Sequence, residues 1–130
     1  MKITRAAFLL GILAAPLLLG EAAASPALSL PRALGVASWY SERDPGINRF
    51  TASGEIFDDQ KLTCASWYHE FGTLLKVTNL RNGKSVVCRV NDRGPHKRLG
   101  RLIDLTKTAF QRIADPRRGL VRVTVTRVSK

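Results

Sequence analysis

The chain has few acidic residues, few aromatic residues and only two cysteines. Ten Asp and Glu stand against 21 Lys and Arg, which gives a formal net charge of +11 at pH 7. Such an excess predicts an anionic partner, with nucleic acid as the first candidate. The length of 130 residues fits one domain, and 45% hydrophobic residues excludes an intrinsically disordered basic tail.

The sequence also lacks an apolar run long enough to span a bilayer. The uncharged run 6–20 falls short of the roughly 20 residues that a membrane-spanning helix needs, and it contains Pro16. It follows a short basic opening and precedes the small residues 22–24, a pattern typical of a signal peptide cleaved near Ala24. No Cys follows the run, so neither a lipid anchor nor another stable membrane anchor is expected.

Export changes how the charge is interpreted. Without residues 1–24 the chain keeps 19 basic and 9 acidic residues, a net charge of +10. Outside the cytoplasm, nucleic acid is excluded as a natural partner, and cell-wall polymers or anionic lipid head groups take its place. The sequence predicts a protein that is periplasmic, wall-associated or secreted.

The two cysteines lie in the exported part. An even number in an oxidising compartment predicts one disulfide, between Cys64 and Cys88, with two buried free thiols as the alternative. The disulfide would close a loop of about 25 residues and contribute on the order of 2–4 kcal/mol. Neither residue has a zinc-ligand spacing, so no metal and no cofactor is predicted.

Short strand signals dominate after a linker over residues 25–33. Alternating side chains and turn residues predict strands at 34–41, 73–79, 84–91, 102–105 and 120–128, with Asn82-Gly83 as a hairpin turn. Thr106 is placed to cap a short helix over 107–114. The pattern predicts one mainly β domain over residues 34–130, folded as a small closed barrel with one helix near its end.

Four segments, in this order, resemble one protein family. They are Gly35–Tyr40, Thr51–Asp58, Val77–Gly83 with Val90–Pro95, and Arg101–Thr106. Together they resemble the rare lipoprotein A (RlpA) family of bacterial wall proteins, related to expansin and barwin domains. The resemblance implies a six-stranded double-psi β-barrel. It also implies an endolytic lytic transglycosylase acting on peptidoglycan glycan strands.

A lytic transglycosylase breaks the bond between N-acetylmuramic acid and N-acetylglucosamine without water. The muramyl 6-hydroxyl attacks its own anomeric carbon and leaves a 1,6-anhydro end. One carboxyl group can serve both steps, first as an acid and then as a base. Hydrolytic glycosidases instead use a pair of carboxyl groups.

Asp104 is the first candidate for this carboxyl group. Its neighbours Ile103 and Leu105 are apolar, and burial among them would raise its pKa toward that of a neutral-pH acid. The alternative is a structural Asp that caps the following helix or bonds backbone amides. The resemblance places a catalytic Asp at this position.

The resemblance also implies that Glu55 and Asp58 line the active-site groove, against the alternative of solvated turn acids. The family pattern has a His eleven positions after that Glu, where this chain has Ser66. Ser66 can bind a sugar by hydrogen bonds but cannot carry a proton near neutral pH. His69 is the nearby alternative proton carrier.

Four aromatic residues are candidates for stacking on sugar rings. Trp67, Tyr68 and Tyr40 are predicted to bind substrate, whereas core packing is the favoured role for Trp39. Residues 91–95 are interpreted as shaping a barrel loop, with a catalytic role for Asp92 as the alternative. The basic residues 96–98 are interpreted as a solvated loop or a site of attraction to wall carboxylates.

The presence of Ser66 where the family pattern has a His supports a second hypothesis, an expansin-like module that binds wall polysaccharide without cleaving it. Both hypotheses give peptidoglycan glycan strands as the partner and expect a monomer. The sequence analysis favours the enzyme.

Overall fold

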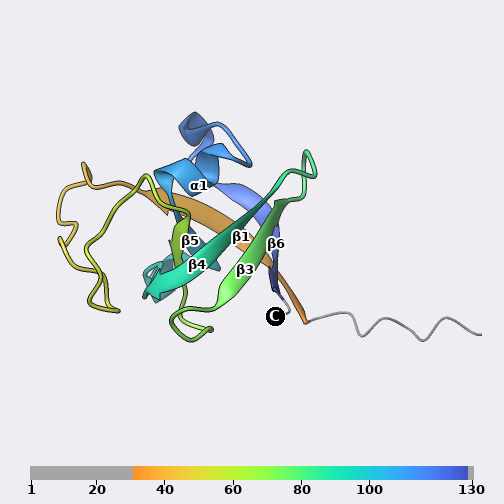
Figure 1. Ribbon diagram of the computed structural model, residues 1–130. Coiled ribbons are helices and arrows are strands. Elements are labelled where there is room, and N and C mark those ends of the chain that lie inside the picture. The colour runs from red at the N-terminus through yellow and green to blue at the C-terminus, as the bar shows by residue number, and fades with distance from the viewer. Residues whose placement is uncertain (1–30, 129–130) are drawn as a thin grey trace, which may run out of the picture.

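The computed structural model describes residues 31–128, shown in Figure 1. The predicted signal peptide and residues 25–30 of the predicted linker lie outside this range. Within it, no helix combines the length and apolar character needed to cross a membrane.

Six strands close into a barrel in the order β1-β5-β2-β4-β3-β6. They are β1 (Arg32–Tyr40), β2 (Thr63–Ala65), β3 (Leu74–Asn79), β4 (Ser85–Asp92), β5 (Ile103–Thr106) and β6 (Val121–Arg127). One short helix, α1 (Lys107–Gln111), and two single 3₁₀ turns, η1 (Lys97–Leu99) and η2 (Pro116–Arg118), complete the fold. The predicted six-stranded double-psi β-barrel architecture is confirmed.

The barrel is mixed, and β5 has one parallel and one antiparallel neighbour. β1 pairs with β5 and β2 pairs with β4 in parallel, while the other neighbouring strands are antiparallel. β5 therefore lies between a parallel and an antiparallel partner, with Asp104 opposite Ser38 on one side and Ala65 on the other. A polar side chain on such a short, doubly flanked strand has little freedom to move.

The barrel interior follows the alternation that the sequence predicts. Val121, Val123 and Val125 of β6 are buried and the side chains between them are exposed or half-buried, as expected. Inward-facing residues from the other strands complete the core, among them Leu75, Val77, Val86, Val90, Ile103 and Leu105. Burial of such side chains is the main favourable term in the folding of a domain this small.

Helix α1 covers the core from outside the sheet (Figure 1). The Thr106 hydroxyl accepts a hydrogen bond from the Ala109 N–H at 3.3 Å, which confirms the predicted N-cap. Ala109, Phe110 and Ile113 are completely buried. The helix ends at Gln111, three residues before the predicted end, and Ile113 follows it in a tight turn.

The strands differ from the prediction mainly in the start of β1 and in the presence of β2, since the other ends agree to within one residue. β1 begins at Arg32 instead of Leu34, because Arg32 and Ala33 pair with Thr126 and Val125 of β6. β2 was not predicted, because three consecutive buried residues show no alternation. Its identity as a strand depends on β4 and β5, which flank it.

Gly35 is required by the close approach of β1 to the chain before β5. A Cβ atom at this position would lie 2.6 Å from the Cβ of Leu102, inside the contact distance of the two atoms. The Leu102 N–H also donates to the Val36 carbonyl at 2.8 Å, which holds the two segments together. The glycine therefore permits the β1–β5 pairing on which the position of Asp104 depends.

Cys64 and Cys88 lie side by side in the core, as predicted, but are not bonded. Both side chains are buried, and their Sγ atoms are 2.8 Å apart. Both are free thiols in this structure, so the disulfide between them stays a prediction. Burial raises the pKa of the Cys64 thiol well above its ordinary value, which keeps it protonated.

Oxidation of the purified protein is expected to join this adjacent pair. A disulfide closing about 25 residues would raise the free energy of unfolding by about 2–4 kcal/mol, since it restricts the unfolded chain. Urea unfolding of the oxidised and reduced protein, with thiols counted under denaturing conditions, measures the difference. The variant Cys64→Ala with Cys88→Ala is the control, because its stability should not respond to oxidant. Equal stability of both redox forms would contradict the expectation.

Candidate functional site

A groove of about 450 Å³ lies beside β5 and is the setting for the predicted site residues. Its base includes Tyr40 of β1, Ala65 of β2 and Asp104 of β5. Its rim comes from two loops, residues 46–52 and residues 92–96. Three strands that are distant in the sequence thus contribute to one open cleft.

Asp104 is half-buried in this groove. One of its carboxylate oxygens accepts a hydrogen bond from the Ser38 hydroxyl at 2.8 Å. The pKa of Asp104 is raised from an ordinary value of 3.8 to about 6, chiefly by burial. The Ser38 hydrogen bond and Arg101 oppose this shift, and Asp44 and Asp92 add to it. A carboxyl group with this pKa can hold and release a proton near neutral pH.

Asp92 and Tyr40 lie beside Asp104 in the same groove. One carboxylate oxygen of Asp92 accepts from the backbone N–H groups of Ala52 at 2.9 Å and Arg93 at 2.8 Å. The other accepts from the Tyr40 hydroxyl at 3.4 Å. Burial and the neighbouring carboxylates raise the pKa of Tyr40, so its hydroxyl stays a hydrogen-bond donor.

The Tyr40 ring also fixes the groove wall, since it stacks on Phe57 with centroids 4.6 Å apart and planes at 11°. Tyr40 is 8% exposed, so its ring packs in the wall instead of lying open to a sugar face. Its predicted contact with substrate is therefore limited to the ring edge that lines the groove.

Glu55 occupies a different environment from Asp104. Its carboxylate accepts two hydrogen bonds from the Arg89 guanidinium, at 2.6 and 2.8 Å, and one from the Asn91 amide at 3.1 Å. These bonds lower the pKa of Glu55 to about 2, so it is ionised at neutral pH. Glu55 clamps its loop to β4 and is not among the residues that line the groove.

Asp58 is grouped with two other acids outside the groove. The carboxylate oxygens of Glu42, Asp58 and Asp59 lie within 4.8 Å of one another. Local donors hold this cluster: Asp58 accepts from the Gln60 N–H at 3.0 Å, and Asp59 accepts from the Ser41 hydroxyl at 2.6 Å. These bonds account for the cluster as loop structure, and a catalytic role for Asp58 stays a prediction.

Ser66 is almost fully buried, at 2% exposure, and its hydroxyl is already engaged. It lies 3.1 Å from Nδ1 of His69 and accepts from the Tyr68 N–H at 3.2 Å. It is not among the residues that line the groove, and its predicted role in substrate binding stays a prediction. Burial lowers the pKa of His69, which favours its neutral form, and His69 does not line the groove.

Trp67 and Tyr68 are exposed, at 43% and 70%, and line a separate depression of about 220 Å³. The Trp67 indole N–H donates to the Pro95 carbonyl at 2.7 Å, and Lys97 lies over the ring at 4.9 Å from its centroid. Trp67 thus has one covered ring face. Trp39 packs against the core and donates to the Pro116 carbonyl at 2.9 Å, as its predicted core role requires.

Two further residues line the groove: Asp92, for which the sequence offers a catalytic role only as the alternative to a structural one, and His96 on the rim, which the sequence does not predict as a site residue. Asp92 ends β4 and is followed by Arg93-Gly94-Pro95, a break that marks a loop where side chains from other segments can converge. His96 was grouped with the basic residues beside it. No local signal distinguishes a groove-lining His from a solvated one.

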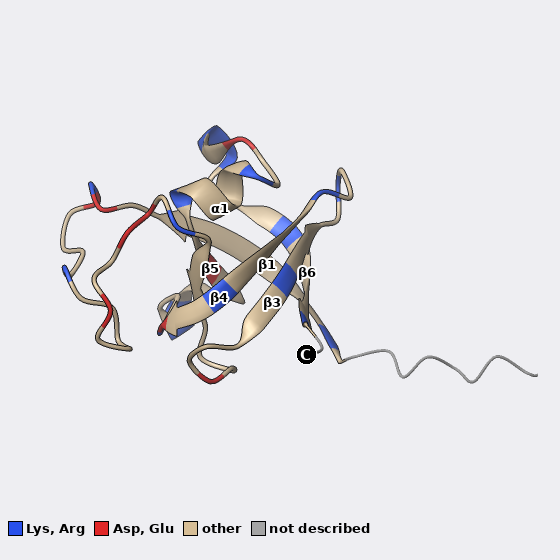
Figure 2. Cartoon of the chain, viewed as in Figure 1, with Lys and Arg blue, Asp and Glu red and all other residues tan. Residues whose placement is uncertain are grey.

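Acidic side chains cluster on one side of the molecule. Figure 2 shows most of them on the long loops beside the barrel, while Lys and Arg are spread over the strands, α1 and the hairpin. Within residues 31–128, the two ion pairs are Arg89–Glu55 and Arg117–Asp115. The groove acids are therefore not neutralised by salt bridges.

A closed six-stranded mixed barrel with an acidic groove over β5 defines a double-psi β-barrel protein. Residues 32–125 match the family model described as "Lytic transglycolase". The chain therefore belongs to the RlpA-like double-psi β-barrel family.

Relatives in several bacteria carry the RlpA name. In Synechocystis, the "Probable endolytic peptidoglycan transglycosylase RlpA" is 54% identical over 80 residues, covering 61% of this chain and 24% of the relative. The protein of the same name in Treponema pallidum is 45% identical, covering 70% and 28%. The "Endolytic peptidoglycan transglycosylase RlpA" of Vibrio cholerae is 43% identical, covering 74% and 36%. The chain thus spans well under half the length of these relatives.

Solved structures share the fold at low sequence identity. An expansin from Clavibacter michiganensis is 22% identical with a TM-score of 0.61, over 77% of this chain and 52% of the expansin. The Streptomyces papain inhibitor is also 22% identical with a TM-score of 0.61, over 76% of this chain and 96% of the inhibitor. These likenesses support the barrel alone.

The raised pKa of Asp104 predicts a pH-dependent loss of stability. The folded protein binds this proton more tightly than the unfolded chain does. The free energy of unfolding should therefore fall as pH rises from about 4 through about 6, by on the order of 2–3 kcal/mol. Asp104→Asn should remove this decline, making the variant equal to the parent near pH 4 and more stable above pH 6.

Urea unfolding over this pH range tests the expectation. Glu70→Gln, which removes an exposed acid on another loop, is the control and should retain the parental decline. Parallel pH curves for the parent and Asp104→Asn would show that Asp104 titrates normally.

Proposed function

We propose that this protein is an exported lytic transglycosylase that cleaves peptidoglycan glycan strands between N-acetylmuramic acid and N-acetylglucosamine. The observation that carries the proposal is Asp104, a half-buried carboxyl group with a pKa of about 6 in an open groove. Membership of the RlpA-like family and the names of the relatives support it.

Asp104 supplies both proton transfers in the proposed reaction. Its protonated form donates to the glycosidic oxygen as the bond from that oxygen to the muramyl anomeric carbon breaks. The muramyl 6-hydroxyl forms a new bond to the same carbon, and the Asp104 carboxylate takes the hydroxyl proton. The products are a free 4-hydroxyl and a 1,6-anhydro end, and Asp104 returns to its protonated form without consuming water.

The other groove residues position Asp104 and the substrate. The Ser38 hydroxyl fixes the orientation of the Asp104 carboxyl group through its 2.8 Å hydrogen bond. Asp92 is tied to two backbone N–H groups and adds negative charge near the anomeric carbon, where positive charge develops as the bond breaks. Exposed Phe50 and Ile47 on the rim offer apolar contact to sugar faces.

The hydrogen bonds from Arg89 to Glu55 indicate that Glu55 and Asp104 have different roles. Because Arg89 holds Glu55 ionised, Glu55 cannot act as the proton donor at neutral pH. Its proposed contribution is to hold the loop that forms one rim of the groove. The proposal therefore rests on a single acid–base residue.

Incubation with isolated glycan strands, with and without stem peptides, tests the activity. Mass spectrometry is expected to find 1,6-anhydro-muramyl ends, each lighter by one water than a hydrolytic product. Asp104→Asn should lower the rate by about 10²-fold or more, since general acid–base catalysis contributes at least that much. Asp115→Asn, which removes an acid paired with Arg117 outside the groove, should leave the rate unchanged. Reducing ends in place of anhydro ends would contradict the lyase mechanism.

The pH profile offers a separate test. The free enzyme needs protonated Asp104, so kcat/KM should fall above about pH 6 and approach a tenfold loss for each further pH unit. The rate is measured on the same strands over a pH series in which the protein stays folded. A flat profile between pH 6 and 8 would remove Asp104 from the role of acid.

A second candidate function is binding of wall glycan without cleavage. It is favoured by one observation, Ser66 in place of the family His, buried and outside the groove. Sedimentation of the protein with insoluble peptidoglycan, together with intact strands at every pH, would select this function and overturn the lyase.

A further inference from the structure

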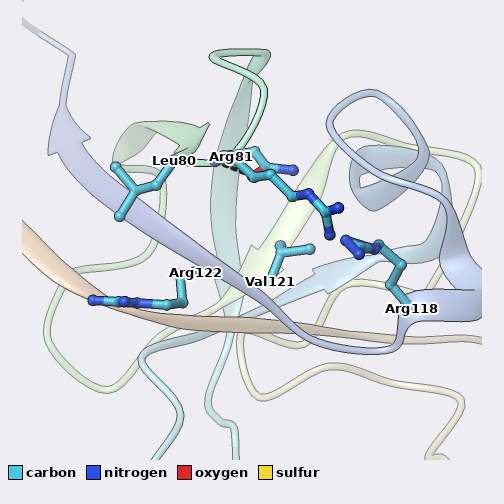
Figure 3. Close-up of a pocket in the computed structure, with 6 residues that line it drawn as sticks. Leu80, Arg81, Arg118, Val121 and Arg122 are labelled. Atoms are coloured by element: carbon cyan, nitrogen blue, oxygen red, sulfur yellow. Dashed lines mark hydrogen bonds between the residues drawn. The ribbon is translucent and has the colours of Figure 1, made fainter.

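A second pocket of about 440 Å³ shares no lining residue with the groove. It lies between the β3–β4 turn, η2 and the start of β6, and is shown in Figure 3. Its lining residues are Asn79, Leu80, Arg81, Arg118, Val121 and Arg122. Half of these residues are arginines.

The backbone on each side of this pocket is held in place. The Arg81 N–H donates to the Asn79 side chain at 2.9 Å, and the Asn79 amide donates to the Ile113 carbonyl at 2.8 Å. Across the pocket, the Arg118 N–H donates to the Asp115 carbonyl at 3.0 Å and closes the η2 turn. The two arginines therefore project from anchored turns that are far apart in the sequence.

The side chains of Arg81 and Arg118 extend toward one another above Val121, while Arg122 extends to the other side (Figure 3). No acidic residue lines the pocket. The nearby carboxylate, Asp115, is bonded to Arg117 at 2.6 Å, and no ion pair within residues 31–128 involves Arg81, Arg118 or Arg122. Two guanidinium groups that converge without an acid repel each other, and a bound anion would relieve this repulsion.

The number of donors indicates which anion fits. A carboxylate has two oxygens and one charge, which a single guanidinium can satisfy with two parallel hydrogen bonds. A phosphate group has more oxygens and, as a monoester, a charge near −2 at pH 7, so it can accept from two guanidinium groups at once. Leu80 and Val121 form the apolar part of the pocket lining, with Val121 beneath the two converging arginines (Figure 3).

We infer that Arg81 and Arg118 form a second binding site, separate from the groove, for a phosphate group. Arg122 adds positive charge at its edge. The site binds phosphate that is free or carried as a terminal monoester on a lipid head group, since both present at least three non-bridging oxygens and a charge near −2. It is independent of catalysis, so its existence does not depend on the proposed lyase activity.

Titration of the purified protein with inorganic phosphate, followed by the NMR signals of the arginine Nε–H groups, tests this site. The signals of Arg81 and Arg118 should move most. Arg81→Gln with Arg118→Gln should weaken phosphate binding by about tenfold or more, because two charge-assisted contacts are lost. Arg32→Gln with Lys76→Gln is the matched control, since it removes the same charge from residues that both flank Thr126 on the barrel wall. It should change binding less than about twofold, the variation expected of screened surface charges.

Co-sedimentation with phosphatidylcholine vesicles, with and without phosphatidic acid, distinguishes the two sources. Binding that needs phosphatidic acid and is lost only in the Arg81–Arg118 variant assigns the site to a lipid head group. Phosphate binding without vesicle binding assigns it to free phosphate. Equal weakening in both double variants, acetate binding as tight as phosphate binding, or no binding of either probe would overturn the inference.

Discussion

The hydrogen bond from Ser38 to Asp104 joins two parallel strands at the point where the barrel presents its acid. The register of β1 against β5 sets this bond, and Gly35 allows the register because it leaves room for Leu102. Ile103 and Leu105 on either side of Asp104 are locked in the core. The carboxyl group is therefore held by the fold itself, beside Tyr40 at the end of β1 and Asp92 at the end of β4, and the loops supply the rim.

Two acids of this chain show how environment determines chemical role. Asp104 has apolar neighbours and one hydroxyl partner, and its pKa is about 6. Glu55 has a guanidinium and an amide, and its pKa is about 2. The sequence analysis placed both in the groove as catalytic residues, because residue type and family pattern do not record which partners the folded chain supplies.

Features with a local cause were predictable from the sequence. Alternation identified β6 and the β3–β4 hairpin, and Thr106 identified the start of α1. Features that depend on distant contacts were not. β2 is a strand only because β4 and β5 flank it. The Ser66 backbone is hydrogen-bonded to Asp92 and Arg93, and Asp92 contacts Tyr40 and Ala52, which lie 40 positions or more away in the sequence. The even number of cysteines correctly predicts that Cys64 and Cys88 lie together in the core, whereas the choice between a disulfide and two free thiols depends on oxidation.

Closure of the barrel limits how the sheet can associate with other polypeptide chains. Each of the six strands has a hydrogen-bonded neighbour on both sides along at least part of its length. An open sheet would offer a full edge strand to which an extended peptide or a second copy could add, and the barrel formed by residues 32–127 has no such edge strand. New contacts must therefore be made by side chains and loops, and the loop between β1 and β2 can change in length or composition without shifting the register of any strand.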